Sequence, residues 1–388
     1  MTINVKELGL ISRFNGVDVT QTQHYIKLSN ATYIDKILKN YPWIFKEHPP
    51  ATFPLLMRSD NEYLHKIETA EPFTEEQRLQ YESDIGFLYQ QGIGEVIYAL
   101  VTCRPDISFA AIKLTQYSTA PSWIHFDALQ DIFCFLTATR EDCIYFWRKK
   151  PRQDLPLGPR PICKEDGNYD EEAQVQEWQQ QDIQILVGAV NSDHASNVKH
   201  RKSVSGIIVK LAGGAVLYKT AYQETVTHSS TESEFVATCD AGKYILYLWS
   251  LLEEIVITQE AATVLNEDNQ GALLMVNAQW PTKCTWHLDL KHFGIQEWFQ
   301  RDLLFLHRMK TIDNYADAMT KPLARTLFYH HMHFIMGCII PQYAYDAMDL
   351  IVCWFFNKNV SKADRNLRFL SREGIILRSR IREIVVVW

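Results

Sequence analysis

Four carboxylates in the second half of the chain lie where a strand is expected to end or a helix to begin: Asp193, Glu234, Asp268 and Asp317. Sites in open α/β sheets assemble at the ends of strands, so these side chains are expected to converge. Two divalent ions about 3.5–4 Å apart can clamp the attacking and leaving oxygens of a displacement at phosphorus. Mg²⁺ or Mn²⁺ suits such hard oxygen ligands. The four carboxylates together could therefore hold two divalent ions.

Each of the four residues also has a purely structural interpretation. Asp193 could cap a turn, and Asp268 and Asp317 could begin helices. Glu234 stands three residues after Thr231, the spacing of a capping box. Acidic residues at strand ends are common, so their joint occurrence in one element order carries the prediction.

Strand and helix patterns over residues 183–337 supply the scaffold. Apolar, β-branched runs predict strands at 183–190, 204–211, 215–219, 262–265 and 303–307, with a glycine pair at 213–214 marking a hairpin. Helical spacing predicts helices at 231–255, 270–275 and 290–300. Three strands followed by alternating helices and strands predict an α/β fold, a mixed five-stranded sheet with flanking helices and Asp193 near its centre.

The rest of the chain differs in composition and in hydrophobic periodicity. Residues 1–147 mix strand-like and helical patterns, and residues 148–182 are rich in Pro, Gly, charge and Gln without apolar periodicity, which is typical of a linker. Residues 338–388 show no assignable domain. The sequence therefore predicts two domains, 1–147 and 183–337, joined by a linker and followed by a tail.

Composition limits the function classes. With 388 residues, 47% hydrophobic and 22% charged, the chain is expected to fold. A net charge of −7 argues against holding nucleic acid by general electrostatic attraction. The eight cysteines show no CxxC spacing, which predicts reduced thiols. Neither a signal peptide nor a bilayer-spanning run is evident, so we expect an intracellular protein, cytoplasmic or nuclear, that is not secreted and binds no membrane.

Six motifs follow one another along the second half: Ser192-Asp193, RKSVSG at 201–206, QETVTHSSTESE at 223–234, EDNQ at 267–270, WHLDLKHF at 286–293 and ADAMTKPL at 316–323. In this order they resemble the ribonuclease H domain of copia-type LTR retrotransposon Pol proteins, whose patterns are SDADWA, RKSxSG, KQxTVxxSSTEAE, xCDNQ, KHIDIRxHF and xADxxTKPL. The resemblance implies a ribonuclease H-like fold and Mg²⁺-dependent hydrolysis of the RNA strand of RNA/DNA hybrids.

The resemblance also assigns roles to individual residues. It implies that four carboxylates bind the two ions: Asp193, Glu234, Asp268 and Asp317. Glu234 is preferred to the alternative Glu232 because an apolar helical stretch follows Glu234. It further implies that His287 assists product release.

An RNA/DNA hybrid is the expected partner, read through the 2′-hydroxyls of the RNA across the minor groove. Ser229, Ser230 and Thr231 precede or begin a predicted helix, and a helix N-terminus can hold a phosphate. Arg201 and Lys202 belong to a basic cluster that could meet the phosphate backbone, although such a loop could equally be only solvated. The sequence gives no indication of an oligomeric state.

The first half carries a weaker resemblance to the same Pol proteins. TCRPDISFA at 102–110 is similar to their TRPDIxFA segment, and VKELG at 5–9 to a segment just after the polymerase palm. No YxDD motif occurs in the chain, so residues 1–147 are interpreted as a reverse transcriptase remnant without polymerase activity.

Departures from the family pattern keep a second hypothesis open. The first motif continues as His194-Ala-Ser-Asn197 without the usual second Asp and Trp, and Trp286 stands where Lys is usual. The alternative is a non-catalytic relic or domesticated Pol fragment that at most binds nucleic acid.

Two other patterns are interpreted structurally. The histidines at 330, 331 and 333 lack a spaced partner for a metal site and predict a solvated helix face. Gly92 and Gly94 lack the further glycines of a phosphate loop and predict helix packing.

Overall fold

A mixed five-stranded sheet organises the second half of the protein. The computed structural model describes residues 10–41, 61–148, 185–196, 201–259, 261–277 and 289–338. The strand order is β7-β6-β5-β8-β9. The strands are β5 (Val187–Asp193), β6 (Val204–Leu211), β7 (Gly214–Tyr222), β8 (Thr263–Glu267) and β9 (Leu304–Arg308). β5, β6 and β7 are antiparallel, whereas β5, β8 and β9 are parallel, which confirms the predicted sheet with Asp193 on its middle strand.

The alternation of side chains along β5 and β6 divides the sheet into two buried faces. Ala189 and Ile208 point into one core, while Val190, Ile207 and Val209 point into the other. Buried on both faces, these strands are as apolar as the sequence predicted.

The β6–β7 hairpin turns at Ala212 and Gly213, both with positive φ (52° and 87°). Two such residues form the tight turn whose twist matches paired strands. The predicted hairpin is therefore present, with Gly214 already in β7.

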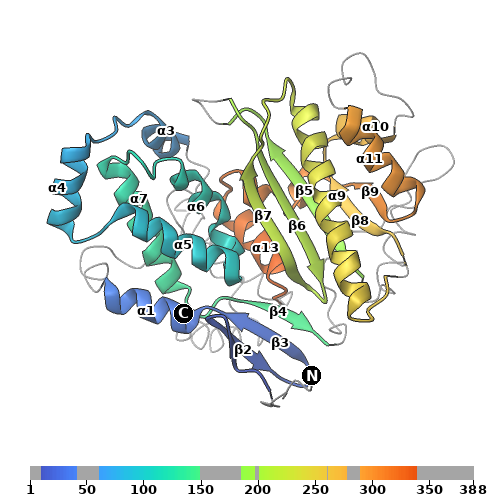
Figure 1. The fold of residues 1–388 in the computed structure, drawn as a ribbon, viewed down its shortest axis with the longest axis horizontal. Helices are drawn as coiled ribbons and strands as arrows, with labels where there is room; N and C mark the ends of the chain where they lie inside the picture. Colours follow the sequence, from blue (N-terminus) through green and yellow to red (C-terminus); the bar gives the residue numbers. More distant parts are fainter. Residues whose placement is uncertain are drawn as a thin grey trace, which may run out of the picture. The chain divides into compact units, whose positions relative to one another are not determined.

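Three helices cover one face of this sheet (Figure 1): α9 (Ser230–Glu254), α10 (Gln270–Asn277) and α11 (Asp289–Gln300). α9 packs on β5 and β6 and buries Phe235, Ile245 and Leu252 in the core. The long helix thereby runs beside the middle strand and brings its first turns to the end of the sheet at which β5 finishes.

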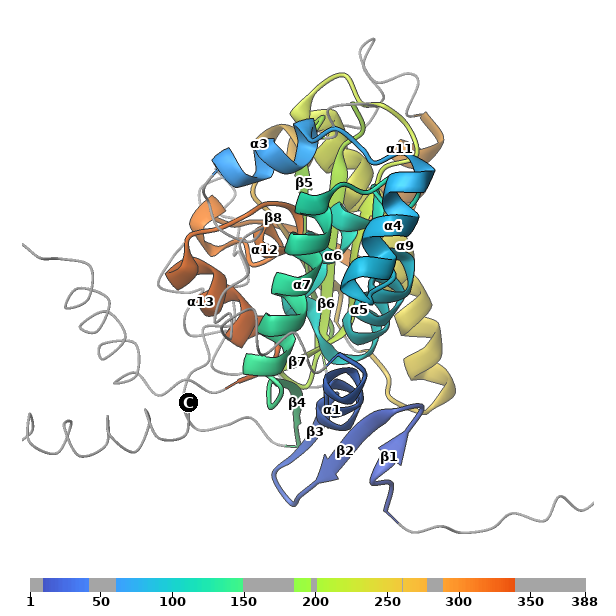
Figure 2. The ribbon, with the colours of Figure 1, turned by 90° about the vertical axis from the view of Figure 1, so that its left-hand side faces the viewer.

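The opposite face is covered by α12 (Asp317–Thr320), α13 (Arg325–Ile335) and helices of the first half. The first half contains α1 (Ala31–Asn40), α3 (Asn61–Thr69), α4 (Glu75–Ile85), α5 (Tyr89–Cys103), α6 (Ser108–Thr115) and α7 (Trp123–Ala138). Figure 2 shows α5, α6 and α7 in front of the sheet. Phe126 and Leu129 of α7 belong to the same core as Phe328 of α13 and Ala189 of β5.

A second, antiparallel sheet lies in the first half. Its order is β1-β2-β3-β4, with β1 (Arg13–Phe14), β2 (Val17–Gln21), β3 (Tyr25–Ser29) and β4 (Cys143–Trp147). The fully buried Arg104 pairs with Asp106 at 2.6 Å and donates to the Thr139 carbonyl at 3.1 Å. The TCRPDISFA segment thus ties α5 and α6 to the end of α7.

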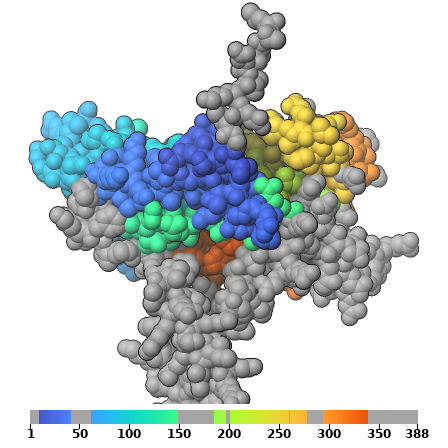
Figure 3. Space-filling model, turned by 90° about the horizontal axis from the view of Figure 1, so that it is seen from below, coloured from blue at the N-terminus to red at the C-terminus, as the bar shows by residue number. Residues whose placement is uncertain are grey.

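β4 joins the two halves directly. The backbone N–H of Trp147 donates to the Ala212 carbonyl at 2.7 Å, and that of Tyr145 donates to the Met336 carbonyl at 2.8 Å. The Trp147 indole also donates to the Gly337 carbonyl at 2.8 Å. Figure 3 shows green surface, the colour shared by α7 and β4, between the blue N-terminal segment and the orange-red C-terminal segment. All described residues fall in one compact unit, Met1–Ile339.

The histidine-rich helix differs from its prediction. His331 is only 1% exposed and its neighbour Met332 is also buried, because α13 packs against the shared core. Burial lowers the pKa of His331 to about 3. The expected solvated face was wrong. The packing role predicted for the two glycines is confirmed for Gly92, where an added Cβ would lie 2.4 Å from the Phe87 ring, and is wrong for Gly94, where an added Cβ would meet nothing within 4 Å. None of the described helices has the length and apolar character needed to cross a membrane.

Candidate active site

The ends of the two central parallel strands bring acidic residues to one edge of the sheet. β5 ends at Asp193, and the neighbouring β8 ends at Glu267, followed directly by Asp268. Parallel strands finish at the same edge, and helix N-termini approach there, so this edge can assemble a site.

α9 supplies a further carboxylate from its first turns. Its N-cap is Ser229, whose hydroxyl accepts the N–H of Glu232 at 3.1 Å, and the Glu232 carboxylate accepts the N–H of His228 at 2.8 Å. The cap lies two residues before the predicted Thr231–Glu234 box, so that interpretation was wrong. With Glu232 engaged in the cap, Glu234 is the residue that faces the sheet edge.

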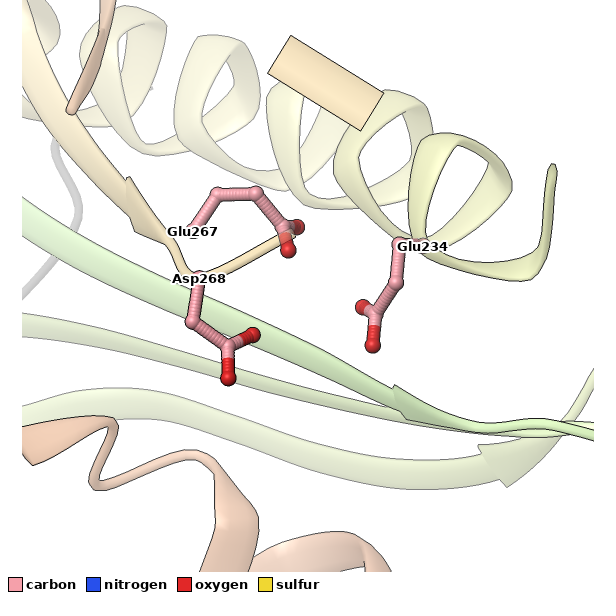
Figure 4. Close-up of side chains that lie close together, drawn as sticks. All are labelled: Glu234, Glu267 and Asp268. Carbon is pink, nitrogen blue, oxygen red and sulfur yellow. The ribbon is translucent and has the colours of Figure 1, made fainter. Parts of the chain in front are cut away.

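Glu234, Glu267 and Asp268 form a cluster in which one carboxylate oxygen of each lies within 4.8 Å of the others. Figure 4 shows the three groups turned toward the space between α9 and the end of β8. Glu234 is 5% exposed, and its Oε2 atom has no hydrogen-bond partner. The cluster therefore holds a buried acceptor that no described donor satisfies.

Asp317, the first residue of α12, lies beside this cluster. Its Oδ2 atom pairs with Lys321 Nζ at 2.8 Å, and its buried Oδ1 atom has no partner. Asn314 donates to the Val190 carbonyl at 3.0 Å and to Asp268 at 3.4 Å, which fastens this segment to β5 and to the cluster. At Gly206 an added Cβ would lie 2.7–2.8 Å from Thr320 and Met319, so the absent side chain lets α12 approach β6.

Burial and mutual repulsion disfavour the charged forms of these groups. Burial, and then the nearby Glu267, raise the pKa of Glu234. Burial likewise raises the pKa of Glu267 and of Asp193. Burial raises the pKa of Asp317 to about 6, although Lys321 opposes the shift. A divalent cation would favour the charged forms of all four carboxyls.

Asp193 is not one of the three residues of the close cluster, but its charge acts on Asp317. The charges of Asp268 and Asp193 both raise the pKa of Asp317, while Lys321 and Lys113 lower that of Asp193. The structure therefore brings Glu234 and Asp268 into direct proximity and places Asp317 within electrostatic range of Asp268 and Asp193. Lys113 belongs to α6 of the first half, where it pairs with Glu68.

The predicted substrate-binding residues lie around this edge. Ser229 and Ser230 are exposed at the start of α9, and Thr231 is half-buried beside them. Arg201 is exposed and Lys202 half-buried in the segment leading into β6. His287 lies outside the described residues.

Sequence reasoning missed Glu267 and Lys321 as members of the site. Glu267 stands at the position of Cys in the xCDNQ pattern, so motif comparison passed over it. The detectable signal was its place as the last residue of a buried strand, directly before a predicted ligand.

The strand order, with three antiparallel strands followed by two parallel ones, agrees with the ribonuclease H-like sheet expected from the sequence. Two solved structures of a ribonuclease H1 isolated from compost, one of them in complex with an RNA/DNA hybrid, match with TM-scores of 0.28 and 0.26 at 13% and 11% identity. They cover 35% and 33% of this chain and 93% and 88% of their own.

Curated relatives confirm the resemblance to retrotransposon Pol proteins. The chain is 24% identical over 329 residues to the retrovirus-related Pol polyprotein from transposon TNT 1-94 of Nicotiana tabacum, which covers 84% of this chain and 22% of that protein. It is 27% identical over 241 residues to the corresponding polyprotein from transposon RE2 of Arabidopsis thaliana, covering 62% of this chain and 14% of the relative. No family model matches. The chain is a homologue of a segment of such polyproteins and spans about a fifth of the first.

Proposed function

We propose that the protein hydrolyses the RNA strand of RNA/DNA hybrids in a reaction that depends on Mg²⁺ or Mn²⁺. The observation that carries the proposal is the convergence of acidic side chains from the end of β8 and the start of α9, with unpartnered buried oxygens on Glu234 and on the nearby Asp317. Similarity to Pol polyproteins supports the same conclusion.

The donor set fits hard divalent cations, because every candidate ligand is a carboxylate oxygen. Glu234, Asp268, Asp317 and Asp193 would hold the ions, which supply an activated water and stabilise the charge on the leaving 3′ oxygen. Asp317 keeps its bond to Lys321, which leaves its other oxygen available.

The remaining residues of the site bind and orient the hybrid. The exposed start of α9, with Ser229 and Ser230, presents backbone N–H groups and hydroxyls suited to a phosphate. Arg201 and Lys202 flank the same edge and are suited to the phosphate backbone. In the same proposal residues 183–337 carry the activity, and residues 1–147 are a reverse transcriptase remnant without polymerase activity.

Cleavage of an end-labelled RNA strand annealed to DNA tests the proposal. The full chain should cut the RNA with Mg²⁺ or Mn²⁺ but not with EDTA, and Asp268→Asn, purified identically, should be inactive. Binding of the hybrid without cleavage would instead support the non-catalytic relic. Primer extension with all four nucleotides should give no product.

A further inference from the structure

Glu267 is a carboxylate that the ligand set proposed above does not include. It is the last residue of β8 and is completely buried. Its Oε2 atom accepts the Thr238 hydroxyl at 3.0 Å, and its Oε1 atom accepts the backbone N–H of Asn269 at 2.9 Å. Both hydrogen bonds come from neutral donors and fix the carboxylate in one orientation.

No described lysine or arginine forms an ion pair with Glu267, Glu234 or Asp268. Burying an ionised carboxylate without a counter-charge is costly. Charges of the same sign at such short range also repel one another. The three carboxylates are therefore balanced by protons or by a cation.

The unpartnered Oε2 atom of Glu234 points to a cation. The Glu234 side chain is only 5% exposed, and its carboxylate is turned toward Glu267 and Asp268 (Figure 4). Glu267 and Asp268 lie on the strand side of this space, and Glu234 on the helix side. Three carboxylate oxygens that lie within 4.8 Å of one another, contributed from both sides of this space, suit a hard divalent ion.

We propose that Glu267 is an additional metal ligand, and that one divalent cation binds between Glu234, Glu267 and Asp268. The inference rests on the proposed function for the presence of a cation, and it adds a ligand to that site. Thr238 and the N–H of Asn269 then orient Glu267, as hydrogen-bonding partners commonly orient metal ligands.

The test measures Mn²⁺ binding by the full chain, using electron paramagnetic resonance of the free ion. Glu267→Gln keeps the shape and removes the charge: its amide oxygen can still accept the Asn269 N–H, and its amide nitrogen can donate to the Thr238 hydroxyl, which itself donates to the Glu234 carbonyl. We expect this change to lower the Mn²⁺ affinity by about 10–100-fold. The matched control is Glu82→Gln. Glu82 is also buried and accepts a backbone N–H, from Tyr89 at 3.0 Å, but it lies in the first half and should leave the affinity unchanged.

A second variant keeps the proposal testable if Glu267→Gln does not fold. Glu267→Cys replaces a hard oxygen with a soft thiolate, so the affinity for Mn²⁺ should fall while that for Cd²⁺ rises. If Glu267 had only a structural role, Glu267→Cys would not shift the preference of the site from Mn²⁺ to Cd²⁺.

The outcomes separate the two proposals. If the wild-type protein cleaves the hybrid but a folded Glu267→Gln protein binds Mn²⁺ as tightly, this inference is overturned and the proposed function stands. If the wild-type protein binds Mn²⁺ through Glu267 but cleaves nothing, the metal site stands and the nuclease proposal fails. Absence of Mn²⁺ binding by the wild-type protein overturns the inference.

Discussion

Asp317 shows at the scale of one residue why the site should depend on cations. Only one of its two oxygens is balanced, by Lys321, and the other is buried without a partner. Burial therefore raises its pKa to about 6, above the ordinary value of 3.8. The charged form needed for metal binding is the form that the metal-free fold disfavours.

This shift gives the metal-free protein a defined dependence on pH. Between pH 3.8 and about 6 the folded state holds a proton on Asp317 that the unfolded state releases, so stability decreases as the pH rises through this window. A pKa difference of one between the two states corresponds to about 1.4 kcal/mol. Because the pKa values of Glu234 and Glu267 are also raised, the stability of the metal-free protein should continue to decrease at higher pH.

Thermal melting in EDTA across this window measures the effect. Asp317→Asn should show a smaller decrease in melting temperature with rising pH than the wild-type protein. Equal slopes for the two proteins would contradict the account of Asp317.

At the scale of elements, the contact between α12 and β6 positions Asp317. Gly206→Ala would place a Cβ 2.7 Å from Thr320, 2.8 Å from Met319 and 3.1 Å from the Ala316 carbonyl. Because α12 must shift, we expect a loss of about 1–3 kcal/mol in the free energy of unfolding and a fall in Mg²⁺ affinity. Urea unfolding and metal titration measure both.

Gly94→Ala provides the matched control for this substitution. Gly94 is exposed within α5 and an added Cβ would meet nothing within 4 Å, so this change should stabilise the protein by up to about 1 kcal/mol without altering metal affinity. A Gly206→Ala protein that behaves like the control would show that α12 does not depend on this close approach.

The elements that carry the site could be predicted because they have strong sequence patterns. Apolar runs, most of them containing β-branched residues, predicted all five strands, and the expected element order placed Asp193 near the centre of the sheet, where the structure has it on the middle strand. The helix cap was misplaced by two residues, since Ser229 and Thr231 offer equally spaced caps and only the backbone decides between them. Glu267 was missed by motif comparison, because motif spacing does not encode whether a strand-end side chain faces a site; its place directly before Asp268 was the only signal that the sequence offered.

At the scale of the whole molecule, the first half is part of the same folded unit as the sheet. The Tyr218 hydroxyl on β7 donates to the Leu100 carbonyl at 2.8 Å, and residues of α7 and α13 share one core. The expected boundary between residues 1–147 and 183–337 therefore separates segments of sequence that pack together in space.

A shared core predicts that both halves unfold together. In hydrogen exchange at increasing urea, peptides from α7 and from β6 should lose protection at the same concentration. Trp147→Phe removes the hydrogen bond to the Gly337 carbonyl and should lower the free energy of unfolding measured on both sets of peptides by about 0.5–1.5 kcal/mol. Trp123→Phe, at a position 58% exposed, should leave both free energies unchanged. Loss of protection in α7 well before β6 would show that the halves are independent.

The central claim is that the acidic edge binds cations rather than stabilising the fold. Melting curves of wild-type protein and Asp193→Asn, each with EDTA and with Mg²⁺, test it most directly. Because burial raises the pKa of Asp193, the neutral variant should be at least as stable as wild type in EDTA. Mg²⁺ should raise the melting temperature of the wild-type protein, since an ion that binds only the folded state stabilises it, and should raise that of Asp193→Asn much less. A wild-type melting temperature indifferent to Mg²⁺, together with an Asp193→Asn variant destabilised by the roughly 0.5–2 kcal/mol typical of a lost cap, would contradict the claim.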